Sequence, residues 1–167
     1  MGRVYWITGL SGAGKTTIAE ALLKAIREAG QSAVFLDGDQ LREVFGRREA
    51  YQREDRLDLA LQYARLCKML SEQGLTVICA TISLFKEVHA WNREHIPGYT
   101  EIFLKVPLDV LRARDSKAIY SQAAEGKLQQ VMGVDIPHDE PPSPDLEIVN
   151  DGSRSPAEIA RIIYELH

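Results

Sequence analysis

The segment from residue 9 to residue 16 constrains the fold most strongly. It matches the phosphate-loop pattern G-x-x-x-x-G-K-[ST] and reads Gly9-Leu10-Ser11-Gly12-Ala13-Gly14-Lys15-Thr16. A strand-like stretch at 3–8 precedes it, and an amphipathic helical pattern at 15–29 follows it, with Ile18, Leu22 and Ile26 on one face. Because a phosphate loop joins a strand to a helix, this context favours a true phosphate site over a glycine-rich turn without a ligand.

Each residue type in the loop has a physical role. Glycines let successive backbone N–H groups point at phosphate oxygens, and the helix N-terminus adds positive potential. Lys15 is predicted to reach the β- and γ-phosphates and to be catalytic, while the Thr16 hydroxyl is predicted to bind Mg²⁺. We therefore expect ATP and Mg²⁺ as cofactors. The expected ATP-binding residues of the loop are Gly9, Ser11, Gly12, Ala13, Gly14, Lys15, Thr16 and Thr17.

Short apolar runs alternate with longer helical patterns, which predicts an α/β domain. We expect a P-loop NTPase fold: a mainly parallel five-stranded sheet, helices on both faces and a small lid. The nearly apolar run 76–82 is expected at the sheet centre. The expected strands are 3–8, 33–37, 76–82, 101–106 and 146–149. The expected helices are 15–29, one from 39, 54–73, 85–95, 108–114, 117–125 and one from 156.

The stretch 129–145 contains four prolines and no regular pattern. A connection of that length in a compact domain is usually functional. We expect a lid at about residues 114–140, within a single domain that spans residues 1–167.

Composition limits the partners. Twenty Lys and Arg residues stand against 24 Asp and Glu, for a net charge of −4, which disfavours non-specific nucleic-acid binding. No apolar run approaches the roughly 20 residues that span a bilayer, and the N-terminus lacks a signal-peptide pattern. These features predict a cytoplasmic protein without a membrane partner. Cys67 and Cys79 are predicted to be buried, reduced thiols, with a redox switch as the alternative.

Two absences narrow the class of P-loop protein. The sequence has no guanine-reading N-K-x-D segment, and the run 76–82 continues into Ser rather than the metal-binding Asp of motor ATPases. A kinase of a small acceptor is therefore predicted, with a nucleotide-binding regulatory module that lacks turnover as the alternative.

Two carboxylates follow the second expected strand. Asp37 and Asp39 would lie at the carboxyl edge of the sheet, where ligands of doubly wound folds bind. Asp39 is the candidate general base, and Asp37 is a candidate for metal or loop support. The alternative for Asp39 is a helix N-cap. Arg42, one turn further on, is a candidate clamp for an anionic acceptor.

Several segments, in order along nearly the whole chain, resemble the adenylyl-sulfate kinase family. They are Gly9 to Thr17, Leu36-Asp37-Gly38-Asp39-x-x-Arg42, Glu54-Asp55-Arg56, Ile82-Ser83, Arg114-Asp115-x-Lys117-x-x-Tyr120, Gly133-x-Asp135-x-Pro137 and Pro144-Asp145. The resemblance implies ATP-dependent phosphorylation of a ribose 3′-hydroxyl. The acceptor would be a nucleotide whose phosphate carries a second anionic group, and the enzyme would be a homodimer.

The resemblance also implies residue roles. Arg114 and Lys117 would belong to the lid, bind ATP and stabilise the transferring phosphoryl group, Arg114 as a catalytic residue. Ordinary helix-surface charge is the alternative for both. The residues implied to face the acceptor are Asp39, Arg42, Tyr51, Arg56, Ser83, Leu84, Lys117 and Val131.

Departures from the family pattern gather on the acceptor side. Of two rings that enclose the acceptor base, one is retained as Tyr51, whereas the other aligns with Val131. An acceptor-binding Asn is replaced by Leu59, and an Arg by Gln62. These changes leave two acceptors open, adenylyl sulfate and cytidine diphosphoramidate. Another small acceptor, such as a sugar acid, is the further alternative.

Overall fold

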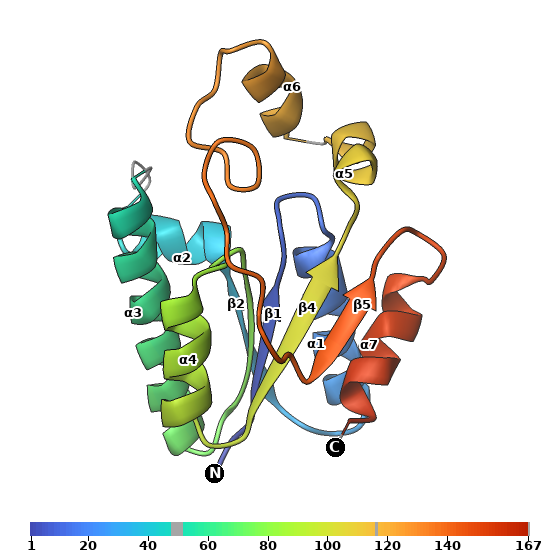
Figure 1. The fold of residues 1–167 in the computed structure, drawn as a ribbon. Helices are drawn as coiled ribbons and strands as arrows, with labels where there is room; N and C mark the ends of the chain where they lie inside the picture. Colours follow the sequence, from blue (N-terminus) through green and yellow to red (C-terminus); the bar gives the residue numbers. More distant parts are fainter. Residues whose placement is uncertain (48–51, 116, 167) are drawn as a thin grey trace.

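The computed structural model describes residues 1–47, 52–115 and 117–166. Within them, parallel strands form one five-stranded sheet in the order β2-β3-β1-β4-β5. The strands are β1 (Val4–Thr8), β2 (Ala33–Asp37), β3 (Thr76–Thr81), β4 (Tyr99–Lys105) and β5 (Leu146–Val149). Helices lie on both faces of this sheet (Figure 1), which confirms the expected P-loop fold.

Two helical layers enclose the sheet. The helices α3 (Arg53–Glu72) and α4 (Lys86–His95) cover one face, whereas α1 (Lys15–Glu28) and α7 (Pro156–Tyr164) cover the other (Figure 1). Successive strand residues point to opposite faces. Accordingly, Val4 and Trp6 join the core under α3 and α4, while Tyr5 and Ile7 join the core under α1 and α7.

The apolar stripe of α1 is buried as its spacing predicts. Ile18, Leu22 and Ile26 are each at most 1% exposed and pack in the core beneath α1 and α7. Burial of each such side chain stabilises the fold by roughly 1.5–3 kcal/mol. At the start of α7, Ser155 and Glu158 form the expected capping box, with Pro156 in the first turn.

The sheet centre is β1 rather than β3. β3 is an interior strand between β2 and β1, and every β3 residue after Thr76 is buried. β1 is buried along its whole length and pairs with both β3 and β4. Apolar composition identifies an interior strand, but the order of strands depends on pairings between distant segments.

The expected lid region lies beyond the carboxyl ends of the strands. It starts at the end of α5 (Leu108–Arg114) and contains α6 (Ile119–Ala124) and most of the irregular return towards β5 (Figure 1). α6 begins two residues later than predicted because Ala118 has a left-handed backbone, with φ of 53°, and the Asp115 carboxylate accepts from the N–H groups of Tyr120 and Ser121. Lys117 therefore precedes α6 instead of lying on it.

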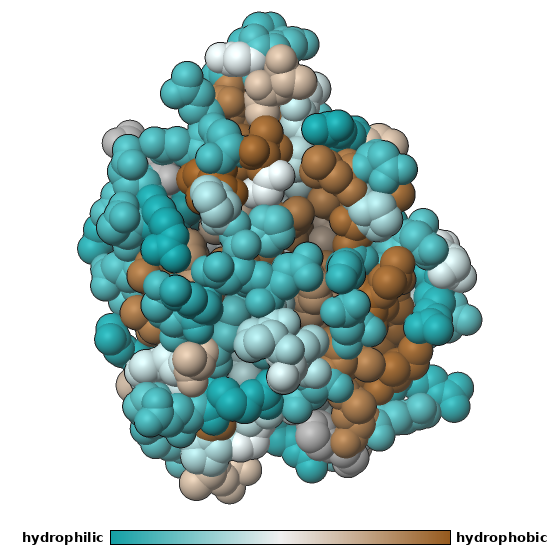
Figure 2. Space-filling view, viewed as in Figure 1, coloured by the Kyte–Doolittle hydropathy of each residue, from teal (hydrophilic) through white to brown (hydrophobic). Residues whose placement is uncertain are grey.

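The face of the molecule seen in Figure 2 is mostly hydrophilic. Hydrophobic residues gather on it over β5 and α7, where Val149 is 53% exposed. Among the described residues, no helix combines the length and the apolarity needed to cross a bilayer. Cys67 and Cys79 are buried free thiols, as expected.

Candidate active site

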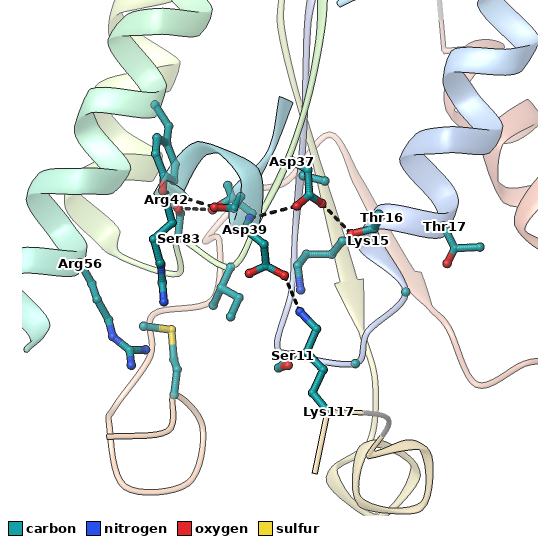
Figure 3. A pocket seen from close by; sticks show the side chains of 18 of the residues that line it. Ser11, Lys15, Thr16, Thr17, Asp37, Asp39, Arg42, Arg56, Ser83 and Lys117 are labelled. Atoms are coloured by element: carbon teal, nitrogen blue, oxygen red, sulfur yellow. Dashed lines mark hydrogen bonds and ion pairs between the residues drawn. The ribbon is translucent and has the colours of Figure 1, made fainter. Parts of the chain in front are cut away.

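A cavity of about 340 Å³ opens at the carboxyl edge of the sheet, and Arg114, Lys117 and Tyr120 of the lid region line it. The phosphate loop forms one wall, and α2 (Gly38–Val44), α3 and the segment after β3 form the other (Figure 3). Residues that the sequence predicts for the site and that line this cavity are Ser11, Gly12, Gly14, Lys15, Thr16, Thr17, Asp37, Asp39, Arg42, Arg56, Ser83, Arg114 and Lys117.

The Lys15 ammonium lies inside the phosphate loop. Its Nζ donates to the Leu10 carbonyl at 2.7 Å, so the side chain spans the loop from within. Burial, and then the positive charge of Lys117, lower the pKa of Lys15 to about 8, while Asp39 and Asp37 oppose that shift. A partly desolvated cation of this kind gains strongly from a phosphate anion.

Two residues assigned to ATP binding shape the loop without lining the cavity. A Cβ on Gly9 would lie 2.7 Å from the Leu104 carbonyl oxygen, so only glycine fits there. Ala13 is fully buried, and its carbonyl accepts from the Asn150 side chain at 2.8 Å. The sequence predicts only a turn at Asn150, so sequence reasoning missed that this side chain supports the phosphate loop.

Thr16 and Asp37 meet across the base of the cavity (Figure 3). The Thr16 hydroxyl donates to the Asp37 carboxylate at 2.8 Å. The other carboxylate oxygen accepts from the backbone N–H of Asp39 at 3.0 Å and of Gln40 at 3.3 Å. Asp37, not Asp39, is therefore the N-cap of α2, which removes the capping alternative for Asp39.

This hydroxyl–carboxylate pair fits a magnesium ion. Mg²⁺ prefers oxygen ligands and is usually held by one or two carboxylates together with water and substrate phosphates. In the described part of the chain, no three His, Cys, Asp or Glu side chains cluster as a protein-only metal site. Thr16 and Asp37 thus supply an oxygen donor set that ATP phosphates and water would complete.

Asp39 forms an ion pair with Lys117 across the cavity mouth (Figure 3). The hydrogen bond from Lys117 is the main cause that lowers the pKa of Asp39, and the charges of Arg42 and Lys15 act in the same direction. Asp39 is thus an ionised carboxylate, as a proton acceptor must be. The pair is solvent-accessible, with Lys117 59% and Asp39 72% exposed, so it is easily exchanged.

Arg114, at the end of α5, reaches over the phosphate loop. It donates to the Asn150 carbonyl at 2.8 Å and approaches the Gly12 carbonyl at 3.5 Å. The hydroxyl of Tyr120 donates to the Ser11 carbonyl at 2.6 Å. Arg114 and Tyr120 therefore reach the phosphate-loop side of the cavity from the lid region.

The acceptor wall carries two arginines and a strained serine. Arg42 and Arg56 line the cavity, and Arg56 donates to the Gln130 carbonyl at 2.7 Å. Ser83 has φ of 31°, which L-residues rarely adopt, and its hydroxyl lies 2.7 Å from that of Thr81. The Thr8 hydroxyl donates to the Ile82 carbonyl, which ties this turn to the strand before the phosphate loop.

Two of the residues implied to face the acceptor do not reach the cavity. Leu84 is fully buried in the core beneath α3 and α4. Val131 is 7% exposed and packs in the opposite apolar cluster, while the next residue, Met132, lines the cavity. Tyr51 lies outside the described residues.

A tight turn explains why Met132, and not Val131, faces the cavity. Gln130 has φ of 61°, and the Asp135 carboxylate accepts from the backbone N–H groups of Gln130 and Val131. This turn directs residue 131 inward and presents residue 132 to the cavity. A motif alignment places the segment here but does not give the orientation of each side chain.

Sequence reasoning also missed Tyr63. This residue of α3 lines the cavity, and its hydroxyl lies 3.4 Å from the Gly38 carbonyl. Burial raises the pKa of Tyr63 to about 12, against the opposing charge of Arg42 nearby. Its place one turn after Leu59 on α3 was the available signal, because both positions then share a helix face.

The protein has a parallel sheet, a phosphate loop and, across the cavity from that loop, a carboxylate and two arginines. These features define a P-loop kinase. The adenylylsulphate kinase family model matches residues 1–149, and the chain belongs to that family. It is therefore a phosphotransferase that takes ATP as a substrate and acts on a nucleotide.

Individual relatives agree with this assignment. The chain is 42% identical over 147 residues to a cytidine diphosphoramidate kinase of Campylobacter jejuni, covering 88% of this chain and 85% of that protein. It is 38% identical over 150 residues to an adenylyl-sulfate kinase of Chloroflexus aurantiacus, covering 90% and 81%. The structure of the Mycobacterium tuberculosis APS kinase CysC in complex with AMPPNP and APS matches with a TM-score of 0.91 and 31% identity, covering 99% of this chain and 96% of that one.

Proposed function

We propose that this enzyme transfers the γ-phosphate of ATP to the ribose 3′-hydroxyl of a small nucleotide with a phosphoanhydride-like tail. The observation that carries the proposal is the placement of Asp39 across one cavity from Lys15, with Arg42 beside it. A carboxylate base, a phosphate-binding lysine and an acceptor-binding arginine thus line one cavity.

The donor side neutralises charge. Lys15 and Arg114 bind phosphate oxygens, and Thr16 and Asp37 would hold the magnesium ion. That ion supplies charge neutralisation for the phosphates when it is bound. Phosphoryl transfer depends mostly on positioning and electrostatic stabilisation, so this set of residues accounts for most of the donor chemistry.

The acceptor side prepares the nucleophile. Asp39 accepts the proton of the 3′-hydroxyl while the oxygen forms a bond to the γ-phosphorus and the bond to the β-phosphate oxygen breaks, which leaves ADP. Lys117 must leave Asp39 for this step, and the incoming phosphates offer it a stronger anionic partner. We further propose that residues 114–140 act as a lid that brings Arg114 and Lys117 to the phosphates, within one domain of residues 1–167.

We propose cytidine diphosphoramidate as the acceptor, with adenylyl sulfate as the second candidate. Leu59 lines the cavity at the position of the family's hydrogen-bonding Asn, and Met132 lines it beside the position of the family's second ring. Loss of a stacking ring removes about 1–3 kcal/mol of base affinity. The 42% identity to a kinase named for cytidine diphosphoramidate supports the same choice. The tail of either acceptor would be bound by Arg42, Arg56 and Ser83.

The test is a side-by-side assay of ATP consumption with both acceptors, with phosphorus NMR of the product to locate the new phosphate. We expect turnover of cytidine diphosphoramidate with a higher kcat/KM than adenylyl sulfate and a 3′-phosphorylated product. Efficient turnover of adenylyl sulfate alone would reverse the order of the candidates. Turnover of neither, with clean turnover of a sugar acid, would reject a nucleotide acceptor.

A further inference from the structure

A buried histidine–glutamate pair lies outside the cavity. His89 of α4 is 3% exposed and Glu101 of β4 is 2% exposed, and the His89 Nδ1 is 2.7 Å from a Glu101 carboxylate oxygen. Neither residue lines the active-site cavity. Buried charges are costly unless they are paired and hydrogen-bonded, so a pair at this depth requires an explanation.

The hydrogen bonds of the pair define its protonation. The His89 Nε2 is 3.0 Å from the backbone carbonyl of Asp139, and a carbonyl only accepts, so Nε2 carries a proton. On the other side, the Glu101 carboxylate accepts from the Tyr99 hydroxyl at 2.8 Å and from Arg93 at 3.4 Å. A carboxylate that faces a hydroxyl donor and a guanidinium is ionised, so Nδ1 also donates. With Glu101 ionised, the imidazolium makes both bonds of His89, whereas a neutral His89 keeps both only with a protonated Glu101 that donates to Nδ1.

The partner of His89 belongs to the segment that returns from the lid region to β5, residues 137–145, here called the strap. Figure 1 shows this segment descending from the lid region to β5. Asp139 of the strap donates its N–H to the Leu84 carbonyl at 2.9 Å, and its carboxylate accepts from the Lys86 N–H at 3.1 Å. Further along, Arg93 donates to Asp145 at 2.8 Å.

The strap is linked to the acceptor wall in two places, through its contact with Leu84 and through the turn that precedes it. Leu84, which Asp139 contacts, directly follows the strained Ser83 of the cavity. Met132, which also lines the cavity, lies in the turn that leads into the strap. A shift of Asp139 therefore moves acceptor-binding residues, while the phosphate loop, on the other side of the cavity, is supported by Asn150 and α1.

We propose that His89, held as an imidazolium by Glu101, is a positioning residue that fixes the strap and thereby the acceptor wall. Use of the acceptor, rather than binding of ATP, then depends on a proton stored in the core. The proposal rests on the proposed function for its kinetic consequence. The titratable and charged groups around the pair are Glu101 and Tyr99 from β4, Arg93, Lys86 and Glu87 from α4, Arg53 from α3, and Asp139 and Asp145 from the strap.

The first test observes the proton directly. Long-range ¹H–¹⁵N NMR of the uniformly ¹⁵N-labelled protein distinguishes an imidazolium from either neutral tautomer, and His89→Gln assigns the signal. We expect both ring nitrogens of His89 to be protonated throughout the pH range in which the acceptor is used. A neutral His89 in the fully active enzyme overturns the proposal. This measurement needs no substrate, so it decides the protonation even where the proposed acceptor proves wrong.

The second test separates acceptor from donor. In His89→Gln, one amide cannot replace both hydrogen bonds, so kcat/KM for the acceptor should fall about 10- to 100-fold, the range expected for misplaced binding groups. The KM for ATP should change less than about threefold. The matched control is His95→Gln, on the same helix but 41% exposed on its side chain and outside the strap contacts, which should leave both constants unchanged. Equal losses for ATP and acceptor overturn the proposal.

The third test removes the need for the proton. In Glu101→Gln, the new amide can donate to Nδ1, so a neutral His89 keeps its Nε2–H on the Asp139 carbonyl. The acceptor kcat/KM at saturating ATP should therefore depend less on alkaline pH in Glu101→Gln than in the wild type. An unchanged alkaline limb in this variant refutes the proposal. Thermal unfolding first establishes that each variant is folded, and the wild-type NMR titration decides should a variant not fold.

Discussion

Replacement of Asp39 by Asn tests the proposed transfer step most sharply. Asn keeps the size of the side chain and leaves the cap of α2, which Asp37 provides, in place. The variant loses two things, the proton acceptor and the ion pair with Lys117. Since both partners of that pair are more than half exposed, its loss costs at most about 1 kcal/mol, or roughly fivefold. Loss of a general base costs about 100- to 10,000-fold in kcat.

The two contributions can therefore be separated by magnitude. We expect Asp39→Asn to lower kcat at least about 100-fold in a coupled ADP-release assay, which is about 2.7 kcal/mol at 1.36 kcal/mol per tenfold change. Lys117→Gln breaks the same ion pair while it keeps the carboxylate, but it also removes a charge proposed to reach the phosphates, so its loss of kcat is an upper bound for the contribution of the ion pair. ATP affinity, measured by calorimetry, should persist in Asp39→Asn. A kcat within tenfold of wild type would show that Asp39 is not the base.

Four further outcomes follow from the same site. Lys15→Ala should abolish phosphate transfer in an ADP-release assay, and full activity would remove the phosphate loop from the mechanism. Because the pKa of Lys15 is lowered to about 8, its charge is lost as the pH rises through 8, so kcat/KM for ATP should decline above about pH 8, and a flat profile to pH 9.5 would contradict that shift. Arg42→Ala should mainly raise the acceptor KM, and unchanged acceptor kinetics would refute the clamp. Met132→Phe restores a ring at the base end and should raise kcat/KM for adenylyl sulfate relative to cytidine diphosphoramidate by about 5- to 100-fold; an unchanged ratio would exclude Met132 from base recognition.

The donor side of the site could be predicted because its signal is local. Spacing in residues 9–16 is enough to place a glycine-rich turn between a strand and a helix, and the structure has that arrangement. The Thr16–Asp37 contact joins two elements, yet it follows from the rule that parallel strands end at the same edge. The central place of β1 did not follow, because strand order depends on pairings between segments far apart in sequence.

The acceptor side could be predicted only to the level of the segment. The motif around residue 131 was found, but the left-handed Gln130 and the Asp135 carboxylate determine which neighbour faces the cavity. Leu84 likewise directly follows a segment that the motif located, Ile82-Ser83, and packing buries it. The partnership of His89 with Glu101 carries no sequence signal, since the two side chains meet only through tertiary packing.

The contacts that hold the two ends of the lid region differ in strength, and this difference bears on how it moves. Near its start, Lys117 reaches Asp39 through an exposed ion pair worth at most about 1 kcal/mol, which phosphates can readily replace. At its end, the strap is held by several hydrogen bonds, among them the one from the buried His89 ring to the Asp139 carbonyl and the one from the Asp139 N–H to the Leu84 carbonyl. We therefore expect ATP to displace Lys117 from Asp39 and to leave the strap in place. On this basis, we expect donor binding to reorganise the phosphate side of the cavity while the acceptor wall stays fixed.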